Sequence, residues 1–395
     1  MISFKEARHI VHTVETPTRE KILPIMNALG HRLFRSVRAP ESLPSFDNSA
    51  MDGWALRSVD LPGTLAVQGE IAAGDCKRRR LEQGKTLRIF TGAPIPEGAE
   101  AVIAQEEVQE IRGAAVFLRA ARPGENIRKA GEDVRRGDML LQKNHKIGPG
   151  QISLLAAMGI TQVPVQASPR VAHMATGSEL LPFDRKTKSG QIRDSVSPLL
   201  ESSLRVSGLP LTSLGIVRDE ETAVEEAIGR LLTFDIAIIT GGVSVGKYDG
   251  VRSALAKAGV QTLFWKVDMK PGKPLYFGRR KDTFIFGLPG NPLSSLVGFE
   301  FFVKPLIARW MGDCVASQKT RYAMPLKKTV AVHGQRKTHL VTVTLDGKNA
   351  VVLTPQGSHR IGQLATAQGL AILSGNKKHY ASGLSVPVHR FEITV

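Results

Sequence analysis

One stretch, Asp235 to Asp249, constrains the fold more than any other part of the chain. Its first residues are short and apolar, Ile-Ala-Ile-Ile-Thr, and Gly-Gly-Val-Ser-Val-Gly follows at once. This pattern predicts a buried strand, a glycine-rich loop and a helix that begins near Gly250.

The glycine-rich loop is suited to binding an anion. Glycine adopts backbone angles closed to other residues, so several N–H groups can point at one anion while the dipole of the next helix faces it. The donors would be the backbone at Gly241, Gly242 and Gly246 and the hydroxyl of Ser244. The spacing is neither that of the dinucleotide fingerprint nor that of a P-loop, so a plain strand-to-helix turn is the alternative.

Length and composition predict a soluble protein of about three domains, since the chain has 395 residues, of which 42% are hydrophobic and 23% charged. No apolar run is long enough to span a membrane, and the N-terminus, Met-Ile-Ser-Phe-Lys-Glu, is unlike a signal peptide. We therefore expect a cytoplasmic protein without a membrane partner. Cys76 and Cys314 stand apart, without the spacing of a metal site or a disulfide framework.

The net charge of +17 suits a nucleic acid, an acidic surface or a small polyanionic substrate. The basic residues form short scattered clusters without interleaved aromatic residues, so they do not resemble a surface on which nucleic-acid bases stack. A solvated basic surface is the favoured interpretation, and no nucleic-acid partner is expected.

The first 168 residues predict a discontinuous N-terminal domain interrupted by a β-rich insertion. Residues 3–15 and 18–29 have helical periodicity, and Pro149 starts another helix. Between about 60 and 140, short β-like runs alternate with Gly and Pro. Two loops carry dense polar groups, one around Asp52 and one around Thr91, although Asp52-Gly53 also fits a simple turn.

Residues 169–312 alternate strands and helices, which predicts a parallel sheet with helices on both faces. Strand-to-helix loops of such sheets open on one edge, where ligands bind. That edge would bring together side chains that are distant in sequence, namely Glu179, Asp219, Ser244, Asp249 and Asn291.

Three lysines, Lys266, Lys270 and Lys273, lie around Pro271-Gly272. The apolar run before them and the Pro-Gly pair predict a strand entering a turn rather than a helix. Ammonium groups beside carboxylates suit a multiply charged anion and a magnesium ion, and a solvated lysine run is the alternative.

After residue 317 the pattern changes to alternating strands, with Asp346-Gly347 as a hairpin signal. The expected fold class is thus a multidomain α/β protein. Its parts would be a discontinuous helical N-terminal domain (1–39 and 140–168), a β-rich inserted domain (40–139), a central parallel α/β domain (169–316) and a C-terminal β-barrel-like domain (317–395).

Taken together, several motifs resemble those of the MoeA family of molybdopterin molybdenumtransferases, which is related to the E domain of gephyrin. The resemblance covers essentially the whole chain and rests on the order of seven motifs. They are Asp47-Asn-Ser-Ala-Met-Asp-Gly53, Thr91-Gly-Ala-Pro94, Gly124-Glu-Asn-Ile-Arg128 with Gly131-Glu-Asp133, Thr176-Gly-Ser-Glu179, Thr240-Gly-Gly-Val-Ser-Val-Gly246, Lys270-Pro-Gly-Lys-Pro274 and Gly287-Leu-Pro-Gly-Asn-Pro292.

The resemblance implies a magnesium-dependent enzyme of molybdenum cofactor biosynthesis that inserts molybdate into adenylated molybdopterin and releases AMP. It implies a MogA-like central domain and a homodimer in which Asp52 and Thr91 reach the cleft from the partner subunit. It also implies molybdopterin adenylyltransferase as the upstream partner. The implied catalytic residues are Asp52, Thr91, Glu179, Asp219 and Asp249, the last three as metal ligands.

The implied substrate-binding residues come from the loops named above and from the last domain. They are Gly241, Gly242, Ser244, Gly246, Lys266, Lys270, Lys273, Pro289, Asn291, Pro292, Ser294 and Ser358. Lys270, Lys273 and Ser294 are the candidates for molybdate, with Ser358 as a further one.

Two departures from the family pattern change the charge beside the predicted cleft. Lys247 stands where the family usually has an acidic residue, and Arg193-Asp-Ser-Val196 replaces a common Tyr-Asp-Thr-Asn. Rival functions are the adenylyltransferase, which would not need the flanking domains, and a scaffold or nucleic-acid binder. The carboxylates and lysines favour the enzyme.

Overall fold

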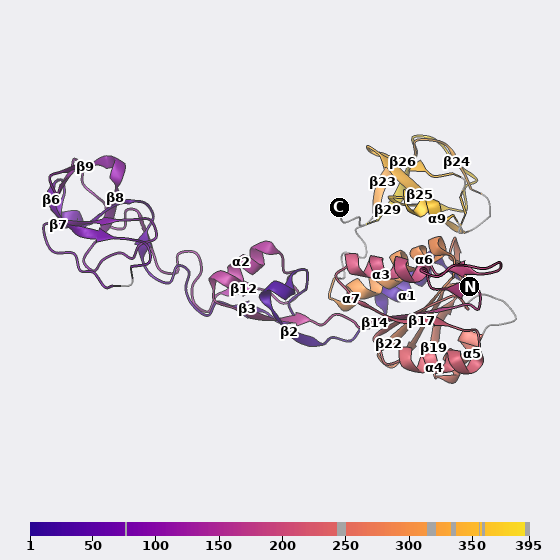
Figure 1. Cartoon of the computed structure of the whole chain (residues 1–395). Helices are drawn as coiled ribbons and strands as arrows, with labels where there is room; N and C mark the ends of the chain where they lie inside the picture. Colours follow the sequence, from indigo (N-terminus) through magenta and orange to yellow (C-terminus); the bar gives the residue numbers. More distant parts are fainter. Residues whose placement is uncertain are drawn as a thin grey trace. The chain divides into compact units, whose positions relative to one another are not determined.

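A computed structural model describes residues 1–75, 77–242, 250–313, 321–332, 337–354, 356–357 and 360–391. The chain forms two compact units, one of residues 1–20 with 166–395 and one of residues 21–165. Figure 1 shows the elements of each. No helix within the described ranges is long and apolar enough to cross a membrane.

The first unit is built on a six-stranded central sheet. Its strand order is β17 (Leu211–Val217), β14 (Val171–Thr176), β18 (Ile236–Thr240), β22 (Thr283–Leu288), β21 (Tyr276–Arg280) and β19 (Gln261–Trp265). The first four strands are parallel, which confirms that part of the prediction. The prediction that the whole sheet is parallel was wrong. A tight turn at Lys281 (φ 53°) makes β21 antiparallel to β22, and β19 is antiparallel to β21.

Helices cover both faces of this sheet (Figure 1). The apolar run of β18 explains why, since Ile236 and Ile238 belong to one buried cluster and Ala237 and Ile239 to another. The first face carries α3 (Val196–Val206), α6 (Pro292–Gly298), α7 (Lys304–Trp310) and α1 (Phe4–Thr13), and the second carries α4 (Glu221–Leu231) and α5 (Gly250–Lys257).

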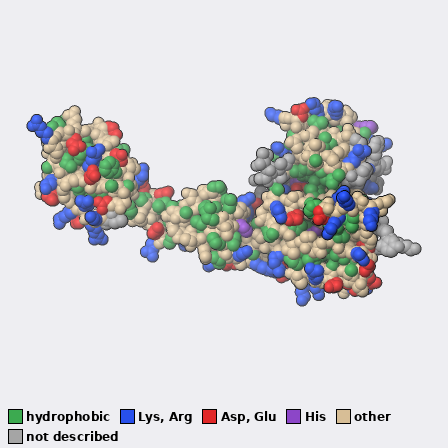
Figure 2. Space-filling model, viewed as in Figure 1, with side chains coloured by type: hydrophobic (Ala, Val, Ile, Leu, Met, Phe, Trp, Pro, Cys, Tyr) green, Lys and Arg blue, Asp and Glu red, His purple; other side chains and the backbone are tan. Residues whose placement is uncertain are grey.

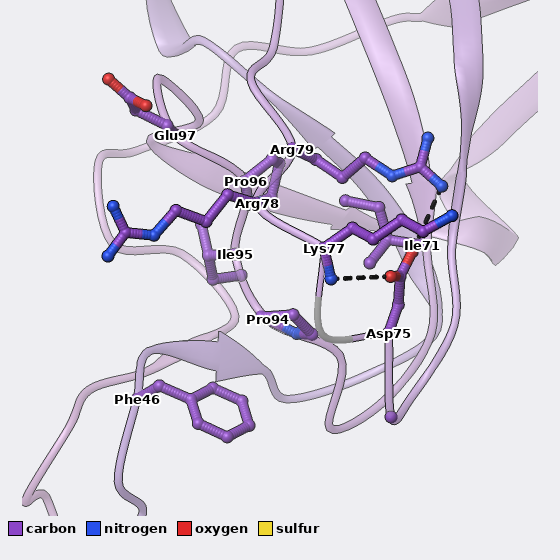
Figure 3. A pocket seen from close by; sticks show the side chains of 11 residues that line it. Phe46, Ile71, Asp75, Lys77, Arg78, Arg79, Pro94, Ile95, Pro96 and Glu97 are labelled. Carbon is purple, nitrogen blue, oxygen red and sulfur yellow. Dashed lines mark hydrogen bonds and ion pairs between the residues drawn. The ribbon is translucent and has the colours of Figure 1, made fainter.

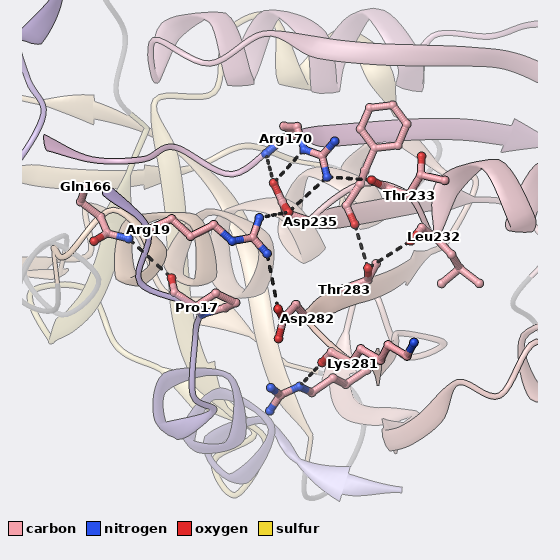
Figure 4. A network of polar contacts seen from close by, with 12 residues as sticks. Pro17, Arg19, Gln166, Arg170, Leu232, Thr233, Asp235, Lys281, Asp282 and Thr283 are labelled. Atoms are coloured by element: carbon pink, nitrogen blue, oxygen red, sulfur yellow. Dashed lines mark hydrogen bonds and ion pairs between the residues drawn. The ribbon is translucent and has the colours of Figure 1, made fainter. Parts of the chain in front are cut away.

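Asp235, at the start of β18, is held by two arginines (Figure 4). Its carboxylate accepts from Arg19 Nη1 at 2.9 Å and from the backbone N–H and Nε of Arg170 at 2.8 and 3.2 Å. Burial raises the pKa of Asp235, but these hydrogen bonds and the nearby positive charges outweigh it and leave the pKa below its ordinary value. The network attaches the segment before residue 20 to the central sheet.

A second sheet in the same unit joins distant parts of the chain. Its order is β1 (Ile2–Ser3), β20 (Val267–Lys270), β25 (Thr338–Asp346), β27 (Gly369–Ser374), β29 (Ser385–Arg390) and β23 (Arg321–Pro325), with β26 (Asn349–Val352) also on β25. The predicted hairpin at Asp346-Gly347 is confirmed, since Asp346 pairs with Asn349 and Gly347 has φ 57°.

The second unit contains the predicted β-rich insertion as a six-stranded sheet. The strand order is β8 (Ala101–Ala104), β5 (Gly53–Leu56), β7 (Lys85–Ile89), β6 (Gly63–Ile71), β10 (Ala114–Phe117) and β9 (Val108–Ile111). A separate buried cluster in this unit includes Leu33, Leu155 and Val163 and surrounds α2 (Pro149–Ala157), the helix predicted from Pro149.

The prediction of a helical N-terminal domain was wrong in part. The predicted helix at 3–15 is confirmed as α1, and Ser3 Oγ accepts from the N–H of Glu6 at 3.1 Å. Residues 18–29 instead form β2 (Glu20–Pro24), which pairs with β13 (Gln162–Gln166), and the short 3-10 helix η1 (Ile25–Ala28). Pro24 lies inside the predicted helix, where it would remove a hydrogen bond and clash with the preceding turn.

The packing of helix α1 also differs from the prediction, which placed it in the N-terminal domain. Phe4 lies 5.3 Å, between ring centroids, from Phe301 and 5.9 Å from Phe302, so the first helix is part of the core of the central unit. Among the described residues of 21–165, α2 is the one α-helix. The four-domain division itself stays a prediction.

Candidate functional site

The carboxyl edge of the central sheet brings together two of the predicted loops. Strand β14 ends at Thr176 and β17 ends at Val217, and these neighbouring strands are parallel. The Thr176 hydroxyl donates to Asp219 Oδ1 at 2.5 Å, and the N–H of Ser178 donates to Oδ2 at 3.3 Å. Asp219 is therefore fixed at the strand ends while its carboxylate stays exposed to solvent.

The glycine loop enters the same site from β18. Gly241 has φ 85° and Gly242 φ 60°, and the N–H of Gly241 donates to the Leu288 carbonyl at the end of β22. A Cβ at Gly241 would overlap the carbonyl oxygen of Thr176, and one at Gly242 would lie 2.7 Å from Val251 Cγ2. Glycine is required here because the loop passes directly against β14. Ser244, Gly246, Lys247 and Asp249 lie outside the described residues.

Glu179 lies beside this edge. Its carboxylate folds over Gly177, where a Cβ would be 2.8 Å from one carboxylate oxygen, and its side chain is exposed. Exposed carboxylate oxygens are the ligands that magnesium prefers in proteins, so Glu179 and Asp219 fit that ion chemically. The described residues contain no group of three His, Cys, Asp or Glu side chains placed to hold a metal, and the third predicted ligand is Asp249.

The lysine segment forms the predicted strand and turn. Strand β20 is followed by a tight loop in which the N–H of Val267 donates to the Lys273 carbonyl at 2.9 Å. Lys270 and Lys273 are exposed, whereas Lys266 (φ 64°) places its Nζ 3.9 Å from the centre of the Trp265 ring. The loop therefore presents two of its three ammonium groups to solvent.

The loop after β22 packs against this lysine loop. A Cβ at Gly272 would lie 3.6 Å from the Ser294 carbonyl oxygen, and Ser294 itself is 4% exposed. Asn291 is the N-cap residue of α6, and Pro292 is its first residue. The Ser295 hydroxyl donates to the carbonyl of Pro289, which fixes the loop from inside. Ser358 lies outside the described residues.

Asp52 and Thr91 meet in the second unit. The backbone N–H and the hydroxyl of Thr91 both donate to Asp52 Oδ1 at 2.8 Å. These hydrogen bonds, the backbone one first, hold the pKa of Asp52 below its ordinary value, with the charge of Arg88 adding to the effect. Nearby, Asp47 accepts from Lys129 Nζ and from the N–H of Ala130, each at 2.8 Å. The two polar loops predicted as a site are thus fixed to each other.

A cavity of about 550 Å³ adjoins Gly177 and Ser178. Its lining includes Phe183, which is 68% exposed, and the cationic Arg218. Arg193, one of the two departures in sequence, donates from Nε to the Arg185 carbonyl at 3.0 Å. Its guanidinium is therefore engaged in part by the loop that precedes α3.

A second cavity, of about 640 Å³, lies in the other unit (Figure 3). Pro94 and Ile95 are among its apolar lining residues. In this view Lys77 and Arg79 extend to one side and Arg78 to the other, and Arg79 is paired with Asp75 at 3.2 Å. Because its cations diverge, it is a weaker candidate for an anion than the edge of the central sheet. On the face that Figure 2 shows, Lys and Arg side chains are spread over the surface among other residue types.

Sequence reasoning missed a buried polar chain below the glycine loop. His173 Nε2 lies 2.9 Å from Thr240 Oγ1, and Nδ1 lies 3.4 Å from Ser197 Oγ, which donates to Asp194. Burial lowers the pKa of His173 to about 4, although the negative charge of Asp194 acts against this. The available signal was a single histidine inside an apolar strand.

Comparison with known proteins assigns the class of this fold. The family described as MoeA N-terminal region (domain I and II) matches residues 2–159, and the probable molybdopterin binding domain matches residues 172–309. These two matches define the class of proteins with a molybdopterin-binding domain that serve molybdenum cofactor biosynthesis.

Relatives match this chain over most or all of their length. The molybdopterin molybdenumtransferase of Haemophilus influenzae is 34% identical and covers 99% of each chain, and that of Bacillus subtilis is 35% identical over 91% of this chain and 87% of its own. The molybdopterin biosynthesis MoeA protein from Pyrococcus horikosii has a TM-score of 0.86, with 28% identity and complete coverage of both chains. The chain therefore belongs to the MoeA family of molybdopterin molybdenumtransferases, which confirms the resemblance seen in the sequence.

Proposed function

We propose that this protein is a molybdopterin molybdenumtransferase that inserts molybdate into adenylated molybdopterin and releases AMP. One observation carries the proposal: Asp219, Thr176 and the Gly241-Gly242 loop converge at the carboxyl edge of the central sheet. A site that cleaves a pyrophosphate link needs anion-binding N–H groups beside carboxylates. The carboxylates would be those of Glu179 and Asp219, and the donors would come from the loop after Gly241, whose own N–H is bonded to the Leu288 carbonyl.

In this proposal the glycine loop binds phosphate oxygens through backbone N–H groups. Glu179, Asp219 and Asp249 would hold a magnesium ion, which when bound neutralises charge on the pyrophosphate. The exposed carboxylate of Glu179 would also orient the attacking water. The water oxygen bonds to phosphorus as the bridging P–O bond breaks, AMP leaves, and the proton of the water passes to a carboxylate or to solvent.

Molybdate, the second substrate, would be bound by the lysine loop. Lys270 and Lys273 are exposed and flexible cations, and Lys266, Ser294 and Ser358 are the further candidates. Ser294 is buried, which makes it a weaker candidate than the two exposed lysines. Pro289, Asn291 and Pro292 would shape this end of the cleft.

The proposal includes a homodimer in the cytoplasm, in which Asp52 and Thr91 of one subunit complete the site of the other. Its support is that these residues are fixed to each other by hydrogen bonds although neither serves the core of its own unit. Molybdopterin adenylyltransferase would supply the substrate. A scaffold role is the second candidate, supported only by the relation of the family to gephyrin.

The test is AMP release from adenylated molybdopterin by the purified protein with magnesium, with and without molybdate. Asp219→Asn and Asp249→Ala should each lower molybdate-dependent release at least a hundredfold. Glu226→Gln, which removes an exposed carboxylate from α4, is the matched control and should retain full activity. A folded wild-type protein that releases no AMP would contradict the transferase and favour a binding role.

A further inference from the structure

The buried chain of polar side chains under the glycine loop has a defined direction. Asp194 is 6% exposed and accepts from the N–H groups of Val196 and Ser197, each at 3.0 Å, and from the Ser197 hydroxyl. As a carboxylate with these three donors it acts only as an acceptor. The one hydroxyl proton of Ser197 is therefore committed to Asp194.

This commitment determines the state of His173. Because Ser197 Oγ has no second proton to give, it can only accept from His173, so Nδ1 must carry the hydrogen. The imidazole is fully buried and is neutral at pH 7, so Nε2 carries none and accepts from the Thr240 hydroxyl. The proton order is Thr240 to His173 to Ser197 to Asp194.

The two ends of this series of hydrogen bonds, Thr240 and Asp194, lie next to loops at the candidate site. Thr240 is the last residue of β18 and immediately precedes Gly241, whose N–H is also fixed by Leu288. Asp194 caps the start of α3 and donates its own N–H to the Leu181 carbonyl at 2.8 Å, within the loop that lines the 550 Å³ cavity. The imidazole therefore joins Thr240, which precedes the glycine loop, to Ser197 and Asp194, which line that cavity.

We propose that His173 is a positioning residue, which as the Nδ1–H tautomer connects Asp194 to Thr240 and keeps the glycine loop aligned with the loop 178–194. The inference rests on the proposed function for its kinetic effect, but not for the tautomer. A misaligned glycine loop would bind phosphate groups less well. Breaking the connection through His173 should therefore raise KM for adenylated molybdopterin more than it lowers kcat.

The first experiment is ¹⁵N NMR of the histidine side chains at pH 7 on the full-length protein. We expect the His173 signals to show a protonated Nδ1 and an unprotonated Nε2. In Ser197→Ala the acceptor for Nδ1–H is gone, so the tautomer population should shift towards Nε2–H, whereas Ser197→Thr should restore the wild-type signals. An Nε2–H tautomer in the wild type would overturn the inference.

The control is Ser203→Ala, which removes a hydroxyl from the same helix that donates to the Leu199 carbonyl at 2.7 Å. It should leave the His173 signals and KM unchanged, while Ser197→Ala raises KM about three- to tenfold, the effect of one hydrogen bond. Equal changes of the His173 signals and of KM in Ser197→Ala and Ser203→Ala would overturn the inference, because α3 would then affect the site only through its packing. If the protein proves inactive on adenylated molybdopterin, the NMR result still decides which nitrogen of His173 is protonated.

Discussion

Asp52 holds the backbone amide and the hydroxyl of Thr91 on a single carboxylate oxygen, Oδ1, with both distances at 2.8 Å. The second oxygen, Oδ2, has no hydrogen bond within the described residues. The carboxylate therefore fixes the loop that begins at Thr91 with one oxygen and presents the other to whatever approaches this face.

Replacing Asp52 should uncouple activity from stability. Asp52→Asn keeps an acceptor for Thr91 but removes the charge, so we expect at least a tenfold loss of AMP release with little change in Tm. Thr91→Val, which removes the hydroxyl donor and keeps the backbone donor, should have a smaller effect on activity. A loss of activity that only tracked a fall in Tm would assign Asp52 a structural role alone.

The glycine loop should not tolerate side chains where it passes β14. Gly241→Ala places a Cβ against the Thr176 carbonyl, and we expect the free energy of unfolding to fall by more than about 2 kcal/mol. Gly290→Ala is the control, because its nearest neighbour would be Gly241 Cα at an ordinary 3.8 Å. Urea denaturation compares the two, and equal stabilities would contradict the close approach.

His173 should make the fold sensitive to mild acid. Its pKa is 6.5 in the unfolded chain and about 4 in the fold, so the unfolded state binds a proton first as the pH falls. Stability from the neutral imidazole is complete above pH 6.5 and is lost progressively towards pH 4, by about 3 kcal/mol. The measurement is the free energy of unfolding between pH 7 and pH 4, and His173→Gln should flatten that slope even if it is less stable throughout.

Asp235 should act in a lower pH window. Its pKa is below the ordinary 3.8, so its stabilising effect is complete above that value and is lost as the pH falls through the folded pKa. At pH 7 we expect Asp235→Asn to cost about 2 kcal/mol, because its carboxylate accepts charged hydrogen bonds. Asp282→Asn is the control: its side chain is 61% exposed and its pairing with Arg19, at 3.4 Å, should contribute less than about 0.5 kcal/mol. Similar losses in both variants would refute the role of burial.

Sequence patterns predicted the parts of the fold that depend on local periodicity. The apolar run before Gly241 was long enough for a buried strand, and the helical periodicity of residues 3–15 correctly predicted α1. The same reasoning failed for residues 18–29, where pairing with β13 decided the structure, and for β21, whose direction was set by a turn at Lys281. Pairing between distant segments leaves no local signal.

The candidate site was predictable where single loops carry the chemistry. Glu179, Asp219 and the glycines lie on strand-to-helix loops, and the topology of a parallel sheet gathers such loops at one edge. His173 and Ser197 were not predicted, because they are 24 residues apart and their roles depend on the packing of α3 over β14. The pairing of Asp52 with Thr91 likewise depends on a turn 39 residues away.

The sheet that contains β20 bears on how this chain could exchange parts with other proteins. Lys270 pairs with His339, and Val267 pairs with Ile2, so the strand that carries Lys270 is paired with the first strand of the chain and with a strand of the last 80 residues. A chimaera with a junction near residue 317 would have to bring a strand matching Met269 and Lys270, or leave their backbone groups without partners. In this chain the strands Ile2–Ser3 and Thr338–Asp346 should therefore be kept together with the lysine loop in any such exchange.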